Sequence, residues 1–276
     1  MSFLRVSSTV HSGEDTVRVR AVIPARQITS ILFLVASSFL ALHLIAYYLF
    51  YHAPIDSSLF RLIVEALDLN AEGTLSTWYS SVTLLACGIG FGFVALAAYQ
   101  DGSPRALHWS ALCLLAMLFS ADEIAGLHEK LNGPVKMLIH AGGFFTFAWV
   151  IPGLVFVLFL LVSFRRFYRS LPRQTRFYLG LATALYFLGS LGLEMVGGEY
   201  SEAYGRDGFG YKALTGLEEF LEMAGVATFL HGIAVHINAH VSWSIPRQLR
   251  EEPAPVASEP RDLVRSIAVV QRSPHG

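Results

Sequence analysis

Six long apolar stretches follow one another along the chain, and each is long enough to cross a lipid bilayer. A transmembrane α-helix needs about 20 consecutive, mostly apolar residues. The stretches that meet this requirement are 28–51, 77–99, 106–127, 135–164, 177–196 and 214–237. The first is longer than the roughly 7–15 apolar residues of a signal-peptide core, so we expect it to be retained as a span. The pattern therefore predicts an all-α fold, a polytopic membrane helix bundle with six transmembrane helices.

Composition supports this class. Of the 276 residues, 54% are hydrophobic and 15% are charged, whereas soluble domains carry about 25% charged residues. The formal net charge of −1 leaves no basic excess for phosphates. We therefore expect the lipid bilayer as a partner and no nucleic acid. Cys87 and Cys113 lie within apolar stretches, a placement typical of neither a disulfide framework nor a zinc site.

The placement of basic residues predicts the orientation of the spans. Cytoplasmic loops of membrane proteins carry an excess of Lys and Arg. With both termini cytoplasmic, most of the 20 Lys and Arg residues lie inside, and the outer side holds only Arg61, Lys130, Lys136, Arg206 and Lys212. We predict a protein of the bacterial cytoplasmic (inner) membrane, with a cytoplasmic N-terminal segment at 1–27, a six-helix transmembrane domain at 28–240 and a flexible cytoplasmic tail at 241–276.

The outer loop between the first two spans predicts an additional amphipathic helix at 56–69. Its apolar residues recur at helical spacing and its charged residues take the other face. The apolar set is Leu59, Leu62, Ile63, Ala66 and Leu67, and the charged set is Arg61, Glu65 and Asp68. Such a helix either lies on the outer membrane surface or packs against the bundle.

Carboxylates gather at the outer ends of three spans. The third span ends in SADEIAGLHE (120–129), the fifth in LEMVGGE (193–199), and the sixth begins with LEEFLEM (217–223). With the predicted orientation, all three strings lie at one depth. The fourth span starts on the same side and adds His140. Ionisable side chains inside a membrane are costly and mark functional sites. On this ground the candidate site consists of Asp122, Glu123, His128, Glu129, Glu194, Glu219 and Glu222.

The spacing within these strings indicates shared helix faces. Asp122 and Glu129 are seven residues apart, and Glu219 and Glu222 are three apart, so each pair meets on one side of a continuous helix. Residues at span ends also lie in the headgroup layer, where charge costs little. That is the alternative for Glu129, and we expect Glu218 to face water.

Three other residues are given structural roles. His43 and His231 lie deeper in their spans, where a lone histidine more often bonds to a neighbouring helix than binds a metal. Trp149 is expected in the aromatic belt at the membrane interface.

A layer of carboxylates in a low-dielectric region needs a counter-charge. Shared protons supply one, and a bound cation supplies another. Carboxylates together with imidazole suit Fe, Mn or Zn, and helix bundles build di-iron sites from inward Glu and His residues. The Glu-x-x-His motif of those bundles does not occur in this sequence. Its absence disfavours a di-iron site and leaves a mononuclear or zinc-type site. We predict a divalent metal ion bound by the candidate site, with Glu123 and Glu222 as catalytic proton carriers; the alternative is a metal-free proton relay.

Three strings resemble a group of bacterial multi-pass membrane proteins that has no assigned function. EGTLSTWYSS (72–81) is similar to the E-G-x-x-x-T-W-x-S-S string of that group, with Thr74 and Ser76 in place of its usual Asn and Pro. SADE followed by HE (120–129) resembles its S-x-D-E-x4-H-E string, and LEEFLEMAG (217–225) its L-E-E-x-x-E-M-x-G string. The resemblance implies the membrane class and the order of the spans, and adds no reaction.

The favoured hypothesis is a metal-binding membrane enzyme that acts on a lipid or another membrane substrate, with the ion activating water or an oxygen species. One alternative is a transporter or channel with an intramembrane proton or ion site. The inner halves of the spans offer few polar groups beyond His231, which disfavours a continuous path. A third hypothesis is a non-catalytic membrane scaffold.

Overall fold

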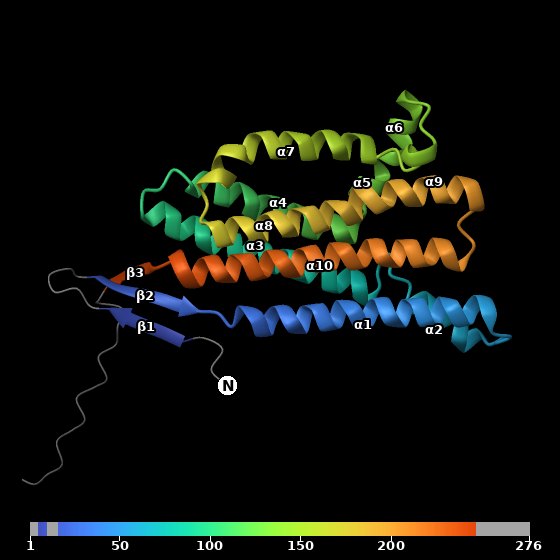
Figure 1. The fold of residues 1–276 in the computed structure, drawn as a ribbon, viewed down its shortest axis with the longest axis horizontal. Coiled ribbons are helices and arrows are strands. Elements are labelled where there is room, and N and C mark those ends of the chain that lie inside the picture. Colours follow the sequence, from blue (N-terminus) through green and yellow to red (C-terminus); the bar gives the residue numbers. More distant parts are fainter. Residues whose placement is uncertain (1–4, 10–15, 247–276) are drawn as a thin grey trace, which may run out of the picture.

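Long helices dominate the computed structural model, which describes residues 5–9 and 16–246 (Figure 1). Within these residues, six helical segments are long and apolar enough to cross a membrane, so the predicted class of an all-α, six-span bundle is confirmed. The spans are Ala25–His52 (α1), Leu75–Gln100 (α3), Ala106–Ala125 (α4), Val150–Ser170 (α7), Arg173–Tyr204 (α8, η2 and α9 in succession) and Phe209–His240 (α10).

The fourth span begins later than the sequence predicted. Instead of starting at 135, it starts at Val150, and the preceding chain forms short elements: α5 (Leu127–Lys130), α6 (Asn132–Leu138) and η1 (Gly143–Phe145). The apolar run is interrupted within the loop after α6. Gly143 has φ +61°, which a regular helix does not allow. His140 lies in this exposed loop.

The fifth span is continuous but not uniform. It consists of α8 (Arg173–Phe187), the π-helical segment η2 (Leu188–Leu193) and α9 (Glu194–Tyr204). A π-helical turn inserts extra backbone into a helix and occurs frequently at functional sites. Here it comes directly before Glu194.

The long helix α10 lies at the centre of the bundle, in contact with α1 and α8 (Figure 1). Small residues allow this close packing: a Cβ built on Gly225 would lie 2.7 Å from the backbone N of Tyr186, and one on Gly232 would lie 2.9 Å from Cβ of Tyr178. Such residues let helix backbones approach closely in membranes. The main apolar core, which includes Phe91 and Val226, forms where α10 meets α3 and α4.

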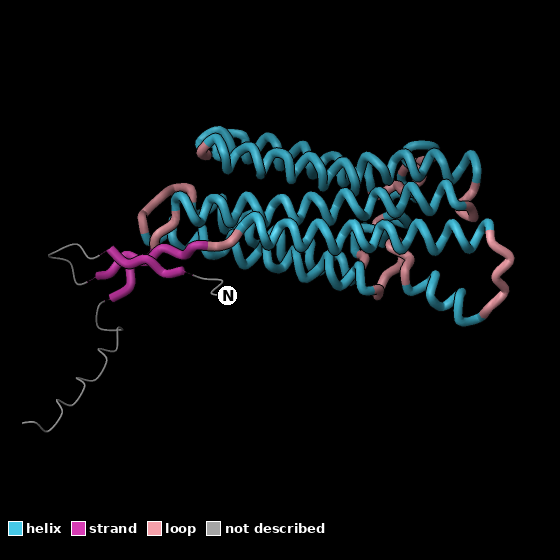
Figure 2. The backbone as a smooth tube through the Cα atoms, turned by 60° about the horizontal axis from the view of Figure 1, so that its bottom comes forward, coloured by secondary structure: helices cyan, strands magenta, loops and turns pink. Residues whose placement is uncertain are grey.

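A three-stranded antiparallel sheet adjoins one end of the bundle (Figure 2). Its order is β1 (Arg5–Thr9), β2 (Thr16–Val22) and β3 (Trp243–Pro246). The sequence predicted no strands, and it predicted a flexible tail from residue 241. That start is wrong, because Val241 is buried in the core and Trp243 pairs with Val19. Residues 247–276 of the predicted tail lie outside the described residues.

The predicted amphipathic helix is present as α2 (Ser58–Ala66), and its one buried residue is Val64. Val64 is buried against Ala46 and Tyr47 of α1, whereas Leu59 and Leu62 are more than half exposed. The helix therefore packs on the bundle with one part of its surface and leaves apolar side chains free for the membrane.

Asp68 follows α2 and is buried, although its spacing placed it on the charged outer face. Its carboxylate accepts hydrogen bonds from Tyr47 Oη at 2.6 Å and from Lys212 Nζ at 2.7 Å. Burial by itself raises the pKa of Asp68, but the hydrogen bonds from Lys212 and Tyr47 outweigh it and hold this pKa below its ordinary value. The contact ties α1 to α10 at the end of the bundle opposite the sheet.

His43 and His231 have the structural roles expected of them. The buried His43 bonds through Nε2 to the carbonyl of Lys212 at 2.8 Å and accepts the N–H of Leu69 at 3.1 Å. His231 bonds through Nδ1 to Thr29 Oγ1 at 2.9 Å. Both histidines therefore connect α1 to α10, and His43 also holds the segment that follows α2.

Candidate functional site

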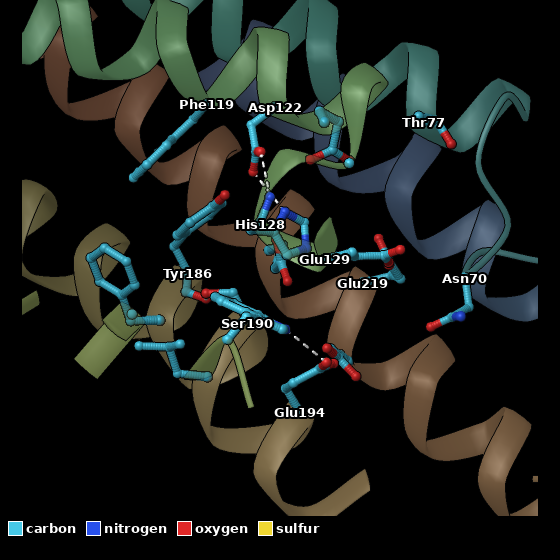
Figure 3. Close-up of a pocket in the computed structure, with 18 of the residues that line it drawn as sticks. Asn70, Thr77, Phe119, Asp122, His128, Glu129, Tyr186, Ser190, Glu194 and Glu219 are labelled. Carbon is cyan, nitrogen blue, oxygen red and sulfur yellow. Dashed lines mark hydrogen bonds and ion pairs between the residues drawn. The ribbon is translucent and has the colours of Figure 1, made fainter. Parts of the chain in front are cut away.

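One cavity of about 360 Å³ brings the acidic strings of three spans together. Figure 3 shows side chains from α4, α5, η2, α9 and α10 lying around the same space. Every residue of the predicted site lines it: Asp122, Glu123, His128, Glu129, Glu194, Glu219 and Glu222. Glu72 and Glu218 add two more carboxylates, and none of the described residues lining the cavity is Lys or Arg.

The carboxylates of the sixth span lie further from the start of their helix than the sequence predicted. The sixth span was predicted to begin at 214, but α10 begins at Phe209. Glu222 is therefore 13 residues into the helix, about 20 Å along its axis at about 1.5 Å per residue.

The end of α4 determines the position of His128. Gly126 adopts φ +53° and ψ +40°, a left-handed conformation that ends the helix. The chain then turns back, so that the backbone N–H of His128 donates to Asp122 Oδ1 at 3.0 Å and its Nδ1 bonds to Asp122 Oδ2 at 2.6 Å. The predicted continuous helix face for Asp122 and Glu129 is therefore wrong, although both residues reach the cavity.

The carboxylate of Glu72 lies directly against Gly126, where a Cβ would collide with it. Glycine is favoured at this position by the left-handed backbone conformation, and any other side chain would also force the Glu72 carboxylate to rotate away.

Asp122 affects the charge of His128. Burial lowers the pKa of the His128 imidazole, but the hydrogen bond and the negative charge of Asp122 raise it by more, so that this pKa lies above its ordinary value. The pKa of the Glu129 carboxyl group also lies above its ordinary value, in this case because the group is partly buried. Because Nδ1 donates to Asp122, Nε2 of His128 is the ring atom left for another partner.

Trp149 supports the same wall of the cavity. Its Nε1 donates to Glu194 Oε1 at 3.1 Å, its backbone N–H donates to Asn132 Oδ1 at 3.0 Å, and its ring packs edge-on against His128 with centroids 4.6 Å apart. Trp149 immediately precedes α7 and is buried inside the protein rather than exposed on its surface. Phe145 of η1 packs against the apolar cluster that contains this indole. The sequence had placed η1 within the fourth span.

Glu218 is 6% exposed and lines the cavity, so the expectation that it faces water is wrong. It lies where η2 approaches α10 most closely: a Cβ on Gly189 would lie 2.8 Å from the carbonyl oxygen of Glu218 and 2.9 Å from Cγ of Glu222. The four-residue separation of Glu218 and Glu222 was the available sequence signal.

Three other lining residues were not among the predicted site residues, although Glu72 begins one of the strings that carry the resemblance. Tyr186 and Ser190 lie within an apolar span, and Glu72 lies in a loop. His140 does not line the cavity. Within residues 5–9 and 16–246, no group of three or more His, Cys, Asp or Glu side chains is close enough together to hold a metal ion as the side chains are placed.

These features define a multi-pass helical membrane protein with a carboxylate-lined cavity inside its bundle. A family model described as "Domain of unknown function (DUF8692)" matches residues 30–237, and the chain belongs to this family. The matched region begins in α1 and ends in α10, so it contains every residue of the predicted site. Comparisons with curated proteins and with solved structures gave no match.

Proposed function

We propose that this chain is a membrane enzyme whose carboxylate cavity binds a divalent cation, Fe, Mn or Zn, and acts on a membrane substrate. The observation that carries the proposal is the lining of the cavity: nine carboxyl or imidazole side chains and, among the described residues, no Lys or Arg. In a low-dielectric region such a group requires positive counter-charge, and a divalent cation supplies it.

The cation's first ligand in this proposal is His128. Its Nδ1 donates to Asp122, and a carboxylate in this position orients a metal-binding histidine and leaves Nε2 for the ion. Glu129, Glu194 and Glu222 would supply oxygen ligands after rotation of their side chains. The ion would act as a Lewis acid on the substrate or on water.

Two carboxylates are assigned to proton transfer. Glu123 extends from α4 and Glu222 from α10, and both line the cavity. Carboxylates in such positions take up and release protons during a reaction. In this proposal they shuttle the proton between the substrate and the cavity.

Metal content tests the proposal. The full chain, purified in detergent without chelators, is measured by elemental mass spectrometry beside His128→Ala, Glu222→Ala and His140→Ala. His140→Ala is the matched control, because His140 lies in the nearby exposed loop and does not line the cavity. We expect a stoichiometric metal in the wild type and in His140→Ala, and its loss in the other two variants.

Two results would overturn the proposal. One is a wild-type protein that binds none of the three metals when each is added before gel filtration. The other is a metal that His128→Ala and Glu222→Ala retain at the wild-type level. In either case a proton or ion path or a scaffold becomes the better hypothesis, and carboxylate variants are then assayed for proton flux in proteoliposomes.

The proposal includes the bacterial inner membrane, with both termini in the cytoplasm and the carboxylate cavity nearer the outer side. A reporter that is active only in the periplasm, inserted in the loop before α2, should be active. The same reporter inserted between α3 and α4 should be silent. The opposite pattern would refute the predicted orientation.

A further inference from the structure

A second cavity, about 600 Å³ in volume, lies behind α7. It is bounded by α3, α4, α7 and α8, and its lining is almost entirely apolar. Among the described residues that line it, the one charged side chain is Arg165, near the C-terminal end of α7. This cavity contributes nothing to the counter-charge of the carboxylates, so the proposed function leaves it without a role.

The cavity exists because α7 touches the bundle mainly at its two ends. The buried residues of α7 are Val150 at its start and Phe167 near its end. Between them, Val157, Leu160, Leu161 and Phe164 line the cavity, at the three- and four-residue spacing of one helix face. In Figure 1, α7 stands apart from α4 and α8 along its middle.

The opposite face of α7 is turned away from the bundle. Val155, Leu158 and Val162 are each more than 60% exposed and do not line the cavity. The helix thus has a bilayer face and a cavity face that are both apolar. This difference allows a lipid in the cavity to be distinguished from lipid around the protein.

A cavity of this size does not stay empty in a bilayer. Packed protein interiors contain few voids larger than a water molecule, and apolar cavities exclude water but bind apolar molecules. The apolar molecules in contact with α7 are the hydrocarbon chains of the membrane. Leu161 is 58% exposed and also lines the cavity, so the space is accessible from the bilayer side of α7.

The two cavities adjoin. Phe119, Tyr186 and Phe187 line both of them, and the rings of Phe119 and Tyr186 stack with centroids 5.8 Å apart. These aromatic rings form the boundary between the apolar cavity and the carboxylate cavity.

We propose that the substrate of the carboxylate cavity is a lipid: one hydrocarbon chain occupies the cavity behind α7, and the headgroup reaches the carboxylates past Phe119 and Tyr186. The carboxylates favour a headgroup that carries hydroxyl or amine groups. The identification of this lipid as a substrate rests on the proposed function. The binding of its chain rests on the cavity behind α7.

Photolabelling tests the chain site. The full-length protein is reconstituted in vesicles of phosphatidylethanolamine and phosphatidylglycerol that contain a phosphatidylethanolamine with a diazirine midway along one acyl chain. Crosslinks are mapped by mass spectrometry. We expect labels on Leu160 and Phe164 of the cavity face as well as on Val155 and Val162 of the bilayer face. A second probe, with the diazirine next to the headgroup, should label η2.

Blocking the cavity provides the decisive comparison. Ala184 lines the cavity, and Ala184→Trp should reduce the cavity-face labels by at least about fivefold, because the indole takes the space of the chain. Bilayer-face labels should not change, and their retention reports that α7 is intact. Ala41→Trp is the matched control, since Ala41 is exposed on α1 and lines neither cavity.

The proposal is overturned if the cavity face is labelled no more than background, or if Ala184→Trp leaves its labels unchanged. Failure of the metal proposal gives a different pattern: no bound metal, with cavity labels that still respond to Ala184→Trp. His128→Ala separates the two in the same way, since it should lose the metal and keep the labels.

Discussion

Gly225 is the position where the structure makes the sharpest prediction about packing. A Cβ at this residue would lie 2.7 Å from the backbone N of Tyr186 and 3.0 Å from its Cα. Optimal non-bonded contacts are about 3.5 Å or longer, so Gly225→Ala requires α8 to move away from α10 by about 0.5–0.8 Å. The obstacle is backbone and cannot rotate away.

The expected cost follows from two opposing effects. Overpacking a well-packed core costs about 1–3 kcal/mol, whereas replacing a helical Gly by Ala recovers about 0.5–1 kcal/mol. The overlap with the backbone places Gly225→Ala toward the upper part of the first range, so we expect a net loss of about 1–2 kcal/mol. For a chain of this size, that lowers the midpoint of thermal unfolding by about 2–8 °C.

Gly197→Ala is the control. Gly197 is also a buried helical glycine, but a Cβ there has its nearest neighbour, Leu214 Cδ2, at 3.9 Å. Its thermal midpoint should therefore stay the same or rise. Both variants are followed by circular dichroism at 222 nm (the α-helix band) in the same detergent. A Gly225→Ala midpoint at or above that of the wild type would refute the close contact between α8 and α10.

Three further predictions concern residues around the site. The folded-state pKa of Asp68 lies below the ordinary 3.8, so its ion pair with Lys212 stabilises the fold fully above pH 3.8 and is lost as the pH falls from there through the folded-state pKa. Asp68→Asn should therefore cost about 3 kcal/mol at neutral pH and flatten the acid side of the thermal stability curve. Gly126→Ala should cost at least about 1–2 kcal/mol in thermal unfolding, because φ is +53°, whereas Gly133→Ala, which has open space around it, should be neutral; equal midpoints would contradict the left-handed turn. Trp149→Phe removes a hydrogen-bond donor to a carboxylate, so it should cost about 1.5–3 kcal/mol and weaken metal retention; unchanged stability would show that the indole N–H is not needed.

Much of the architecture could be predicted from local sequence. Apolar run length identifies six spans because the bilayer sets the length of a helix that crosses it. The same reasoning fails where a run contains conformational breaks: Gly126 and Gly143 end or interrupt helices inside stretches that hydropathy treats as continuous. A hydropathy average depends only on the types of side chain in a stretch, so it does not report the backbone conformation that a glycine adopts.

The candidate site was predicted as a list of residues and a common depth. The sequence places Asp122, Glu194 and Glu222 at corresponding ends of their spans, because alternate helices run in opposite directions. It says nothing of which helix lies next to which. Glu218 is an example. Its neighbours along α10 are the same whether it faces water or the cavity, and the close approach of η2 at Gly189 buries it.

By itself, the sequence determined the membrane class, the number of spans and the shared end of the bundle at which the carboxylates lie. These features depend on run length and on the alternation of direction along the chain. Only the tertiary structure decided that His128 turns back onto Asp122 and that an apolar cavity adjoins the carboxylates at Phe119 and Tyr186. The first depends on one left-handed glycine. The apolar cavity depends on packing between α4, α7 and α8. The residues in contact there are distant in sequence, so no local sequence pattern predicts their contacts.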